Sequence, residues 1–259
     1  MSHLYDRLES FTKCYLDTYY SVSPTLDEIA INRFVNAHLH RIGRRWTSYL
    51  EISPEGGVHH MIPFVPWVDT LISADFREDA RLETRRWVSG APEAFSWDHY
   101  ISMALAHEAI EPTEAAVRAR REDMRLKLKT IIPCDVTKFP IVDSSVVEVS
   151  AESVLGMFFV AGEVGETVEG WQSVVRNVCD SVPPGGHVFM SALRGMSQYN
   201  VRQPDGTVIT FPCAPLYGED YDRLLPTLGF STATVEEFEI PVPDCGLSGI
   251  IMVSATKTA

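Results

Sequence analysis

The chain contains Cys-Asp-Val-Thr at residues 134–137, Ser-Val-Leu-Gly-Met-Phe-Phe-Val at residues 153–160 and Val-Pro-Pro-Gly-Gly-His-Val at residues 182–188. An amphipathic helix pattern through Trp171 and Arg176 lies between the last two segments. This order predicts a strand end that carries an acid, a buried strand, a crossover helix, a tight turn and another strand. The succession is typical of the second half of a doubly wound α/β sheet, where the acid after one strand contacts an adenine and the next strand ends at the substrate.

Length and composition indicate one domain that acts on a small molecule. The chain has 259 residues, of which 45% are hydrophobic, so residues 1–259 can form a single domain with its own core. No run of about 18 apolar residues and no secretory signal occurs, and we expect a cytoplasmic protein without a membrane span. The net charge of −13 argues against nucleic acid as a partner. It favours a neutral or cationic substrate, although solubility alone explains the charge equally well.

Cysteine and histidine usage predicts no metal site. The five cysteines are scattered, without a Cys-x-x-Cys pair, and reduced thiols are the natural interpretation. His59 and His60 are adjacent, and side chains next to each other in a chain usually point in different directions. His38 and His40 have no acid or cysteine at ligand spacing.

Helices are expected at the N-terminus and in an insertion. Residues 5–20 show Leu8, Phe11, Tyr15 and Tyr19 on one side. A second helix begins at Thr25, with Glu28 as the partner in a capping box, and ends near residue 43. Residues 91–127 form a helical insertion, and together with residues 1–45 they are expected to form a lid over the open side of the sheet.

Seven strands are expected in the sheet. The expected strands are residues 47–52, 70–75, 129–134, 154–160, 187–193, 235–241 and 250–255, the last two as an antiparallel pair. A crossover helix is expected over residues 78–89 and another helix over residues 219–228, ending at Gly229. Asp205-Gly206 predicts a tight hairpin turn.

Four motifs, in the same order along the chain, resemble one known family. The motifs are Tyr15-Leu16-Asp17-Thr18-Tyr19-Tyr20, Pro92-Glu93-Ala94-Phe95-Ser96-Trp97, Cys134-Asp135-Val136-Thr137, and Val175-Arg176-Asn177-Val178 with Pro184-Gly185-Gly186. Over nearly its whole length the sequence resembles the nicotinamide, phenylethanolamine and indolethylamine N-methyltransferase family, including bacterial relatives. The resemblance implies a class I fold, which is a mostly parallel, seven-stranded, Rossmann-like sheet with an N-terminal helical lid. It also implies S-adenosyl-L-methionine (SAM) as the cofactor.

The resemblance also implies where SAM binds. The outer tyrosines of the first motif close over the cofactor, the loop after the first strand holds its methionine end, Asp75 holds the ribose and Asp135 the adenine amine. The cofactor residues implied in this way are Tyr15, Tyr20, Glu51, Ser53, Gly57, His59, Asp75, Phe76, Asp135, Val136 and Phe158.

The loop after the first strand departs from the family pattern. Ser53 and Glu55 occupy its two glycine positions, although glycine adopts a positive φ far more readily than serine or glutamate. If Glu55 faced the cofactor, its carboxylate would oppose that of the methionine. The favoured expectation is that Glu55 points to solvent and that Gly56-Gly57 form the turn. The family's second ribose contact, an amide side chain, is Ala80 here.

The substrate side is also altered relative to the family. Glu163, Ser191 and Tyr199 occupy the positions that the resemblance assigns to substrate binding, but one of the family's two acids is replaced by Ser191. This loss favours phenols, aromatic heterocycles or activated carbons over cationic amines. Glu163 is the candidate acceptor for a substrate proton, and Tyr20 contributes to closing the site.

The sequence therefore predicts SAM-dependent methyl transfer to a small molecule by direct displacement, with an amine or a heterocycle nitrogen of specialised metabolism as the first candidate acceptor. An O- or C-methyltransferase of a biosynthetic pathway is the alternative within the same class. A non-catalytic, methyltransferase-like binding protein with a degenerate glycine loop is the alternative from another class.

Overall fold

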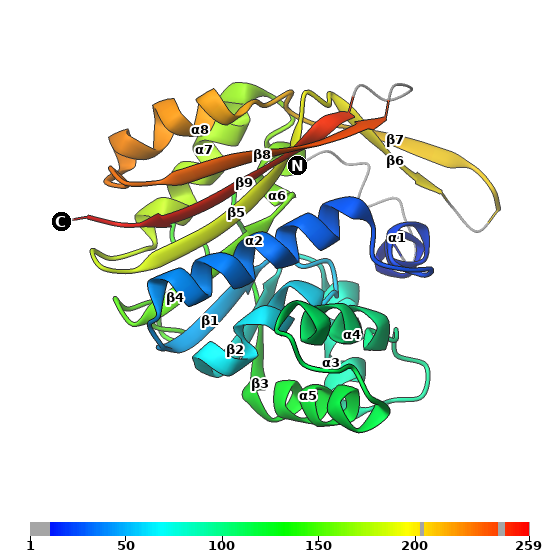
Figure 1. Cartoon of the computed structure of the whole chain (residues 1–259). Helices are drawn as coiled ribbons and strands as arrows, with labels where there is room; N and C mark the ends of the chain where they lie inside the picture. Colours follow the sequence, from blue (N-terminus) through cyan, green and yellow to red (C-terminus); the bar gives the residue numbers. More distant parts are fainter. Residues whose placement is uncertain (1–10, 203–204, 243–246, 259) are drawn as a thin grey trace.

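The computed structural model describes residues 11–202, 205–242 and 247–258, and its centre is a seven-stranded sheet (Figure 1). The strand order is β3-β2-β1-β4-β5-β9-β8. The strands are β1 (Trp46–Ile52), β2 (Val68–Asp75), β3 (Leu128–Pro133), β4 (Ser153–Phe158), β5 (His187–Arg194), β8 (Thr234–Val242) and β9 (Leu247–Thr256). The first five strands are parallel, whereas β9 runs antiparallel to both β5 and β8. The predicted fold class and the C-terminal antiparallel pair are confirmed.

The strand order reverses at β1, which lies between β2 and β4. Glu51 on β1 is aligned with Ser73 on β2 and with Gly156 on β4. Consecutive side chains of a strand point to opposite faces, so Leu50 enters one hydrophobic core and Tyr49 the other. Both faces of the strand are therefore buried, as is usual for parallel strands covered by helices.

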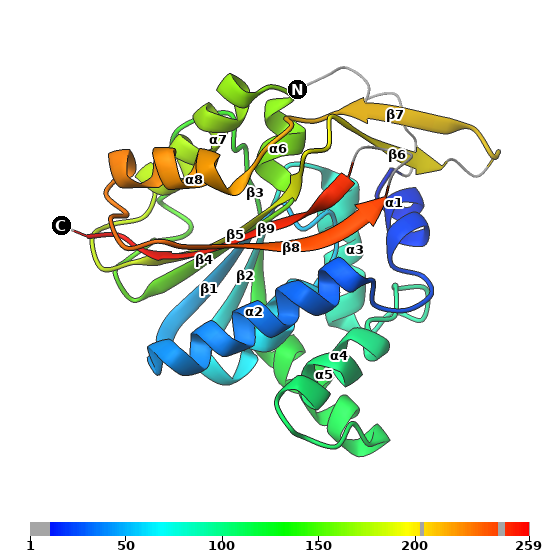
Figure 2. The same ribbon diagram turned by 45° about the horizontal axis from the view of Figure 1, so that its top comes forward.

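Helices cover both faces of the sheet (Figure 2). The first face carries α6 (Val160–Gly165), α7 (Val168–Asp180), α8 (Gly218–Leu224) and η3 (Leu225–Leu228). The second face carries α2 (Leu26–Ile42), η2 (His59–Trp67), α4 (Asp98–His107) and α5 (Glu114–Lys127). The crossover helix α3 (Glu78–Ser89) packs beside β2 and β3. Among the described residues, no helix combines the length and the hydropathy needed to cross a bilayer.

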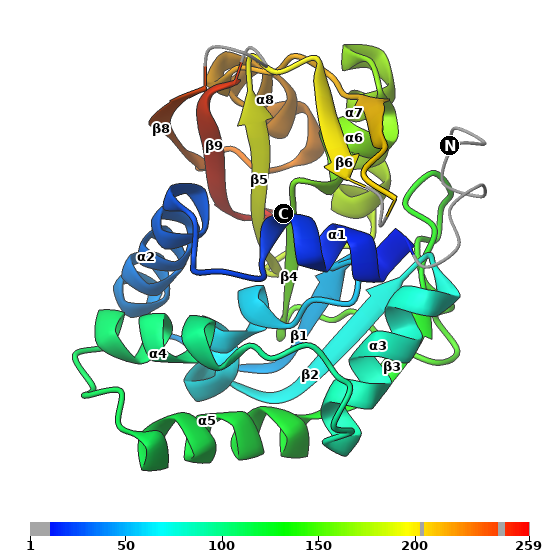
Figure 3. The same ribbon diagram turned by 90° about the vertical axis from the view of Figure 1, so that its right-hand side faces the viewer.

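A smaller layer lies at the carboxyl end of the sheet (Figure 3). It consists of α1 (Phe11–Tyr19) and a hairpin of β6 (Gln198–Arg202) and β7 (Val208–Pro212). Phe11 and Cys14 of α1 share a buried cluster with Tyr199 and Phe211 of the hairpin. The hairpin predicted at Asp205-Gly206 is thus confirmed, and it holds α1 over the end of the sheet.

Three details differ from the expectations. The fourth strand ends at Phe158, because Phe159 adopts a left-handed backbone conformation with φ 63° and α6 follows. The capping box at Thr25 is wrong, since Thr25 makes no capping hydrogen bond and Glu28 is buried against two histidines. Of the helix expected over residues 5–20, residues 5–10 lie outside the described residues.

The two expected parts of the lid also occupy different places. Of the described part of the lid, α1, the following Tyr20 and the first turn of α2 border the cavities described below, for example at Tyr15 and Asp27. The rest of α2 packs along the second face of the sheet, as do α4 and α5 of the insertion. The apolar face of α2 includes Phe34, which contacts Phe189 of β5.

We expect Gly156→Ala to destabilise the fold by about 1–3 kcal/mol, the usual cost of overpacking a core. A Cβ at this position would overlap the hydroxyl of Tyr49 and lie 2.6 Å from its Cζ atom. The free energy of unfolding in urea measures the effect. Tyr49→Phe removes the overlapping hydroxyl, so the double variant should lose less stability than the sum of the two single variants. Additive losses would show that the Tyr49 hydroxyl is not the obstacle.

Candidate active site

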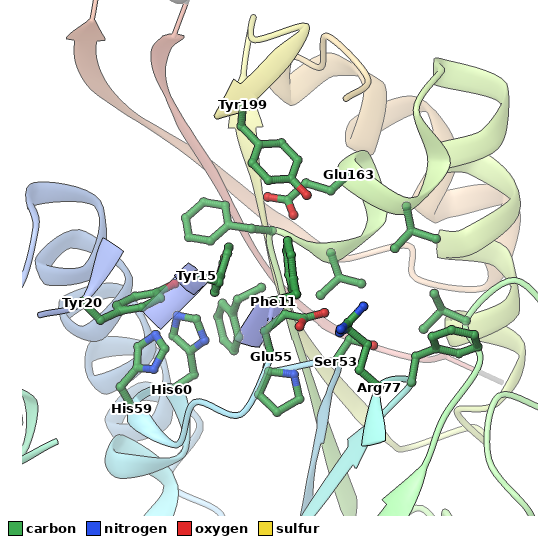
Figure 4. Close-up of a pocket in the computed structure, with 17 residues that line it drawn as sticks. Phe11, Tyr15, Tyr20, Ser53, Glu55, His59, His60, Arg77, Glu163 and Tyr199 are labelled. Atoms are coloured by element: carbon green, nitrogen blue, oxygen red, sulfur yellow. The ribbon is translucent and has the colours of Figure 1, made fainter. Parts of the chain in front are cut away.

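A cavity of about 790 Å³ opens where the carboxyl ends of β1, β2 and β4 meet, and we call it the central cavity. Figure 4 shows the side chains that line it. Nine of the residues predicted from the sequence lie in its wall: Tyr15, Tyr20, Ser53, His59, Phe76, Val136, Phe158, Glu163 and Tyr199. Eight further residues were missed: Phe11, Pro54, Glu55, His60, Arg77, Phe159, Val160 and Val164. Adjacency to predicted residues is the signal that could have identified several of them.

Two predicted cofactor residues, Glu51 and Gly57, lie behind the cavity wall. Glu51 is 1% exposed and accepts a hydrogen bond from the hydroxyl of Tyr49. Gly57 is buried so closely beneath the ring of His59 that a Cβ would lie 2.9 Å from that ring. Both residues support the wall and do not line it.

Asp75 and Asp135 also lie outside the wall, for different reasons. Asp75 is fully buried at the end of β2; its Oδ1 accepts the backbone N–H of Arg77 at 3.1 Å, and its Oδ2 has no partner. Asp135 borders a separate hollow, which it shares with Phe76. Its carboxylate accepts hydrogen bonds from Thr137 and pairs with Lys138 at 2.8 Å. Although partial burial opposes the effect, Lys138 and Thr137 hold the pKa of Asp135 below its usual range.

Ser191, which was predicted to contact the substrate, lines neither the central cavity nor the second cavity that adjoins it. It is 1% exposed, and the backbone N–H of Phe159 donates both to its carbonyl oxygen at 3.1 Å and to its Oγ at 3.2 Å. Ser191 therefore helps to position Phe159 at the left-handed turn between β4 and α6, through its backbone and its side chain.

Two residues of the loop after β1 adopt a backbone conformation that is typical of glycine, although neither of them is glycine. Ser53 has φ 53° and Glu55 has φ 50°, a region that side chains with a Cβ rarely adopt. Gly56 has φ 82°, and a Cβ there would lie 2.8 Å from Cγ2 of Thr12 on α1. The loop therefore packs tightly against α1, which leaves it no room to relax.

The expectation that Glu55 points to solvent is wrong. Its side chain enters the central cavity, close to Arg77 (Figure 4), and its Oε2 atom is buried without a hydrogen-bond partner. Burial and the neighbouring carboxylate of Asp75 raise the pKa of Glu55 well above its usual range. Burial likewise raises the pKa of Asp75 to about 7. The carboxyl groups of Glu55 and Asp75 are close enough that ionisation of one makes ionisation of the other less favourable.

Glu163 and Tyr199 lie side by side at one end of the cavity (Figure 4), and the Tyr199 hydroxyl donates a hydrogen bond to the Glu163 carboxylate. Burial raises the pKa of Glu163 to about 8, even though this hydrogen bond acts to lower it. A carboxyl group with such a pKa can take up or release a proton near neutral pH. Its position at the start of α6 follows from the left-handed turn at Phe159.

A buried cluster of His59, His60, Glu28 and Glu51 lies beneath the tyrosines of α1. Atom Nε2 of His60 is 3.1 Å from Oε2 of Glu28, and Nε2 of His59 is 3.4 Å from Oε1 of Glu28. Despite burial, the carboxylates of Glu28 and Glu51 raise the pKa of His60 to about 10. Burial and the charge of His60 lower the pKa of His59 to about 4.

A second cavity of about 960 Å³, the outer cavity, adjoins the central one. The two cavities share Tyr15, Tyr20, Phe159, Glu163 and Tyr199. Asp27, Glu28 and Glu163 contribute three acids to the outer cavity, and no lysine, arginine or histidine is among its described lining residues. Asp27 and Glu28 come from the start of α2, and the sequence gave no sign that this turn reaches the site.

Comparisons with known proteins show the family of this chain. The profile of the NNMT/PNMT/TEMT family matches residues 5–258. Indolethylamine N-methyltransferase of Oryctolagus cuniculus is 22% identical over 222 residues, which cover 83% of this chain and 80% of that enzyme. Phenylethanolamine N-methyltransferase of Homo sapiens is 21% identical over 193 residues, which cover 74% of this chain and 65% of that enzyme.

Solved structures share the fold. The DhpI-SAM-HEP complex superposes with a TM-score of 0.53 at 12% identity, covering 95% of this chain and 94% of that chain. A SAM-dependent methyltransferase from Clostridium acetobutylicum ATCC 824 superposes with a TM-score of 0.55 at 6% identity, covering 95% and 99%. At such low identity the likeness shows the fold alone.

We expect the Glu163→Gln variant to be more stable than the parent, by a margin that grows between about pH 4.5 and pH 8. The folded pKa of about 8 lies above the ordinary value of 4.5, so the folded state keeps a proton that the unfolded state releases in this window. The parent therefore loses up to about 1.4 kcal/mol per pH unit, a loss that the glutamine variant avoids. Urea unfolding at several pH values measures the difference, with the exposed Glu169→Gln as the control. Parallel stability curves for parent and Glu163→Gln would contradict the raised pKa.

Proposed function

Because the chain belongs to the NNMT/PNMT/TEMT family and is a SAM-dependent methyltransferase, we propose that its acceptor is the nitrogen of a small basic amine. The observation that carries this proposal is the outer cavity, in which acids and tyrosines gather without a described basic side chain. Carboxylates attract an ammonium group, and aromatic faces add cation–π attraction. The names of both enzyme relatives point to amine acceptors as well.

The central cavity and the residues behind its wall fit SAM at most points. Asp75 lies behind the wall, and its unpartnered Oδ2 is an acceptor of the kind that the ribose hydroxyls need. Phe76 borders both the central cavity and the hollow beside Asp135, so a nucleoside could extend from one to the other past its ring. SAM would supply an electrophilic methyl group, while the chain supplies alignment and exclusion of water. One point disagrees, because Glu55 places a carboxyl group where the methionine carboxylate is expected.

The chain's own residues can prepare an amine for attack. An ammonium ion has no free lone pair, so it must lose a proton before it can accept a methyl group. Glu163 lies in the wall shared by both cavities and can accept that proton, and Tyr199 orients its carboxylate. Tyr15 and Tyr20 lie 5.8 Å apart, ring centre to ring centre, and cover the junction from α1. Burial keeps the pKa of Tyr20 well above its usual range, so Tyr20 closes the site as a neutral phenol.

Asp27 and Glu163 are the acids best placed to hold the ammonium group. Glu28 is already engaged by His59 and His60. Burial raises the pKa of Asp27, and the negative charge of Glu28 raises it further. A bound cation would supply the positive charge that favours the ionised form of Asp27. In this proposal, Asp27 of α2 takes the place of the acid that the sequence resemblance assigns to the position of Ser191.

The proposal is tested with a panel of small amines, matched phenols and carbon acceptors, with S-adenosylhomocysteine formation as the readout. We expect turnover with amines. Glu163→Gln should lower kcat by about 100-fold, because it removes the proton acceptor. Asp27→Asn should raise KM by about tenfold with a smaller effect on kcat, because it removes one charge that holds the ammonium. The exposed Glu169→Gln is the control.

Turnover with phenols or carbon acceptors alone would reject the amine and support the O- or C-methyltransferase alternative. If no acceptor turns over and S-adenosylhomocysteine does not bind, the degenerate-loop alternative would gain support instead.

We expect Glu55→Gln to tighten binding of S-adenosylhomocysteine by about three- to tenfold at alkaline pH, where more of Glu55 is ionised, because the substitution removes a carboxylate that opposes the ligand's own. Ser53→Gly is the matched control, since it relieves a positive φ in the same loop without changing charge. It should raise the free energy of unfolding by about 1 kcal/mol and leave affinity within about twofold. Calorimetric titration and urea unfolding measure both effects. Equal affinities for the parent and Glu55→Gln would show that Glu55 avoids the ligand carboxylate.

A further inference from the structure

Three buried side chains converge at the junction of α2 and the loop after β1. Oε1 of Glu28 lies 3.4 Å from Nε2 of His59, and Oε2 lies 3.1 Å from Nε2 of His60. Donor atoms of all three residues lie within 4.8 Å of one another. A tetrahedral zinc ion with bonds of about 2.1 Å holds its ligand atoms about 3.4 Å apart, so these spacings suit a shared ion.

His59 has fewer partners than a buried polar ring normally has. Its side chain is 3% exposed, as is that of Glu28, and that of His60 is 7% exposed. Nδ1 of His59 has no hydrogen-bond partner, and Nε2 lies 3.4 Å from Oε1 of Glu28, which is longer than a usual hydrogen bond. A buried nitrogen without a partner is costly, and coordination to a metal ion would remove that cost.

A supporting carboxylate stands behind one of the histidines. Nδ1 of His60 lies 3.5 Å from Oε1 of Glu51, an oxygen that has no hydrogen-bond partner. Glu51 is itself held by the hydroxyl of Tyr49. Histidines that bind metals through one nitrogen almost always direct the other toward a carboxylate or carbonyl, which orients the ring.

His59 and His60 are the first two residues of the 3-10 helix η2, and this backbone brings their rings close together. Their centroids are 4.0 Å apart, with the planes tilted by 41°. The expectation that neighbouring histidines point apart is therefore wrong here, and Glu28, the third donor, is 31 residues away from His59 in the chain. Two histidines and one glutamate form a donor set that zinc uses in catalytic sites with an open position.

We propose that Glu28, His59 and His60 bind one divalent first-row transition-metal ion, with zinc as the ion best matched to the donors. The two histidines line the central cavity and Glu28 lines the outer one, so the ion would lie in the wall between them. The competing explanation is a metal-free network in which His60 carries a proton between Glu28 and Glu51.

The test uses the full chain, treated with a chelator and then dialysed, without cofactor or acceptor. Its result is therefore independent of the proposed function. Co²⁺ is titrated while visible absorption is followed, Zn²⁺ is then added in competition, and bound metal is measured by mass spectrometry. We expect one equivalent of metal per chain. Glu28→Gln should abolish this binding, and Glu51→Gln should weaken it by about 10- to 100-fold.

His40→Asn is the matched control, because His40 is an exposed histidine on α2, the same helix as Glu28. It should bind metal as the parent does. The absence of stoichiometric binding in the parent, or binding by folded Glu28→Gln as tight as in the parent, would overturn the proposal.

If Glu28→Gln fails to fold, measurements on the parent protein alone still test the proposal. We expect micromolar Zn²⁺ to raise its melting temperature and the chelator to reverse the rise. An unchanged melting temperature would favour the metal-free network.

Discussion

The position of β1 between β2 and β4 is the constraint on which the site depends. Parallel strands bring their carboxyl ends to one edge, and the reversal of strand order opens a crevice at that edge. Gly156 on β4 leaves room for the ring of Tyr49 on β1. Tyr49 in turn holds Glu51, and Glu51 lies behind the cavity wall, beside His60. Core packing and site geometry are thus connected through a few side chains.

The loop after β1 shows how backbone shape can persist when its usual residues are lost. Ser53 and Glu55 adopt positive φ values that glycine would adopt without strain. Tight packing of Gly56 against Thr12 on α1 fixes the turn, so the strain, on the order of 1 kcal/mol per residue, is retained. The result is a loop that carries a carboxyl group, in a fold that usually presents backbone donors at this place. Arg77, which lies beside Glu55, offsets part of its charge.

Acidic groups have been redistributed around the substrate side. Ser191 supports the turn at Phe159, while Asp27 and Glu28 reach the outer cavity from α2. Glu28 belongs to two environments at once, since it borders the outer cavity and contacts both histidines. The outer cavity and the histidine cluster therefore share one carboxylate, and a change at either is expected to affect the other.

The sequence alone determined the fold class, because the succession of strands, helices and turns leaves local patterns in the chain. The cofactor was implied by the family resemblance, as were Tyr15, Tyr20 and Glu163, which the structure places in the wall of the central cavity. Only the tertiary structure decided the direction of Glu55, since its side chain is directed by packing of the loop against α1. The tertiary structure also brought Glu28 to His59 and His60, because contacts between distant segments leave no periodic signal in the chain.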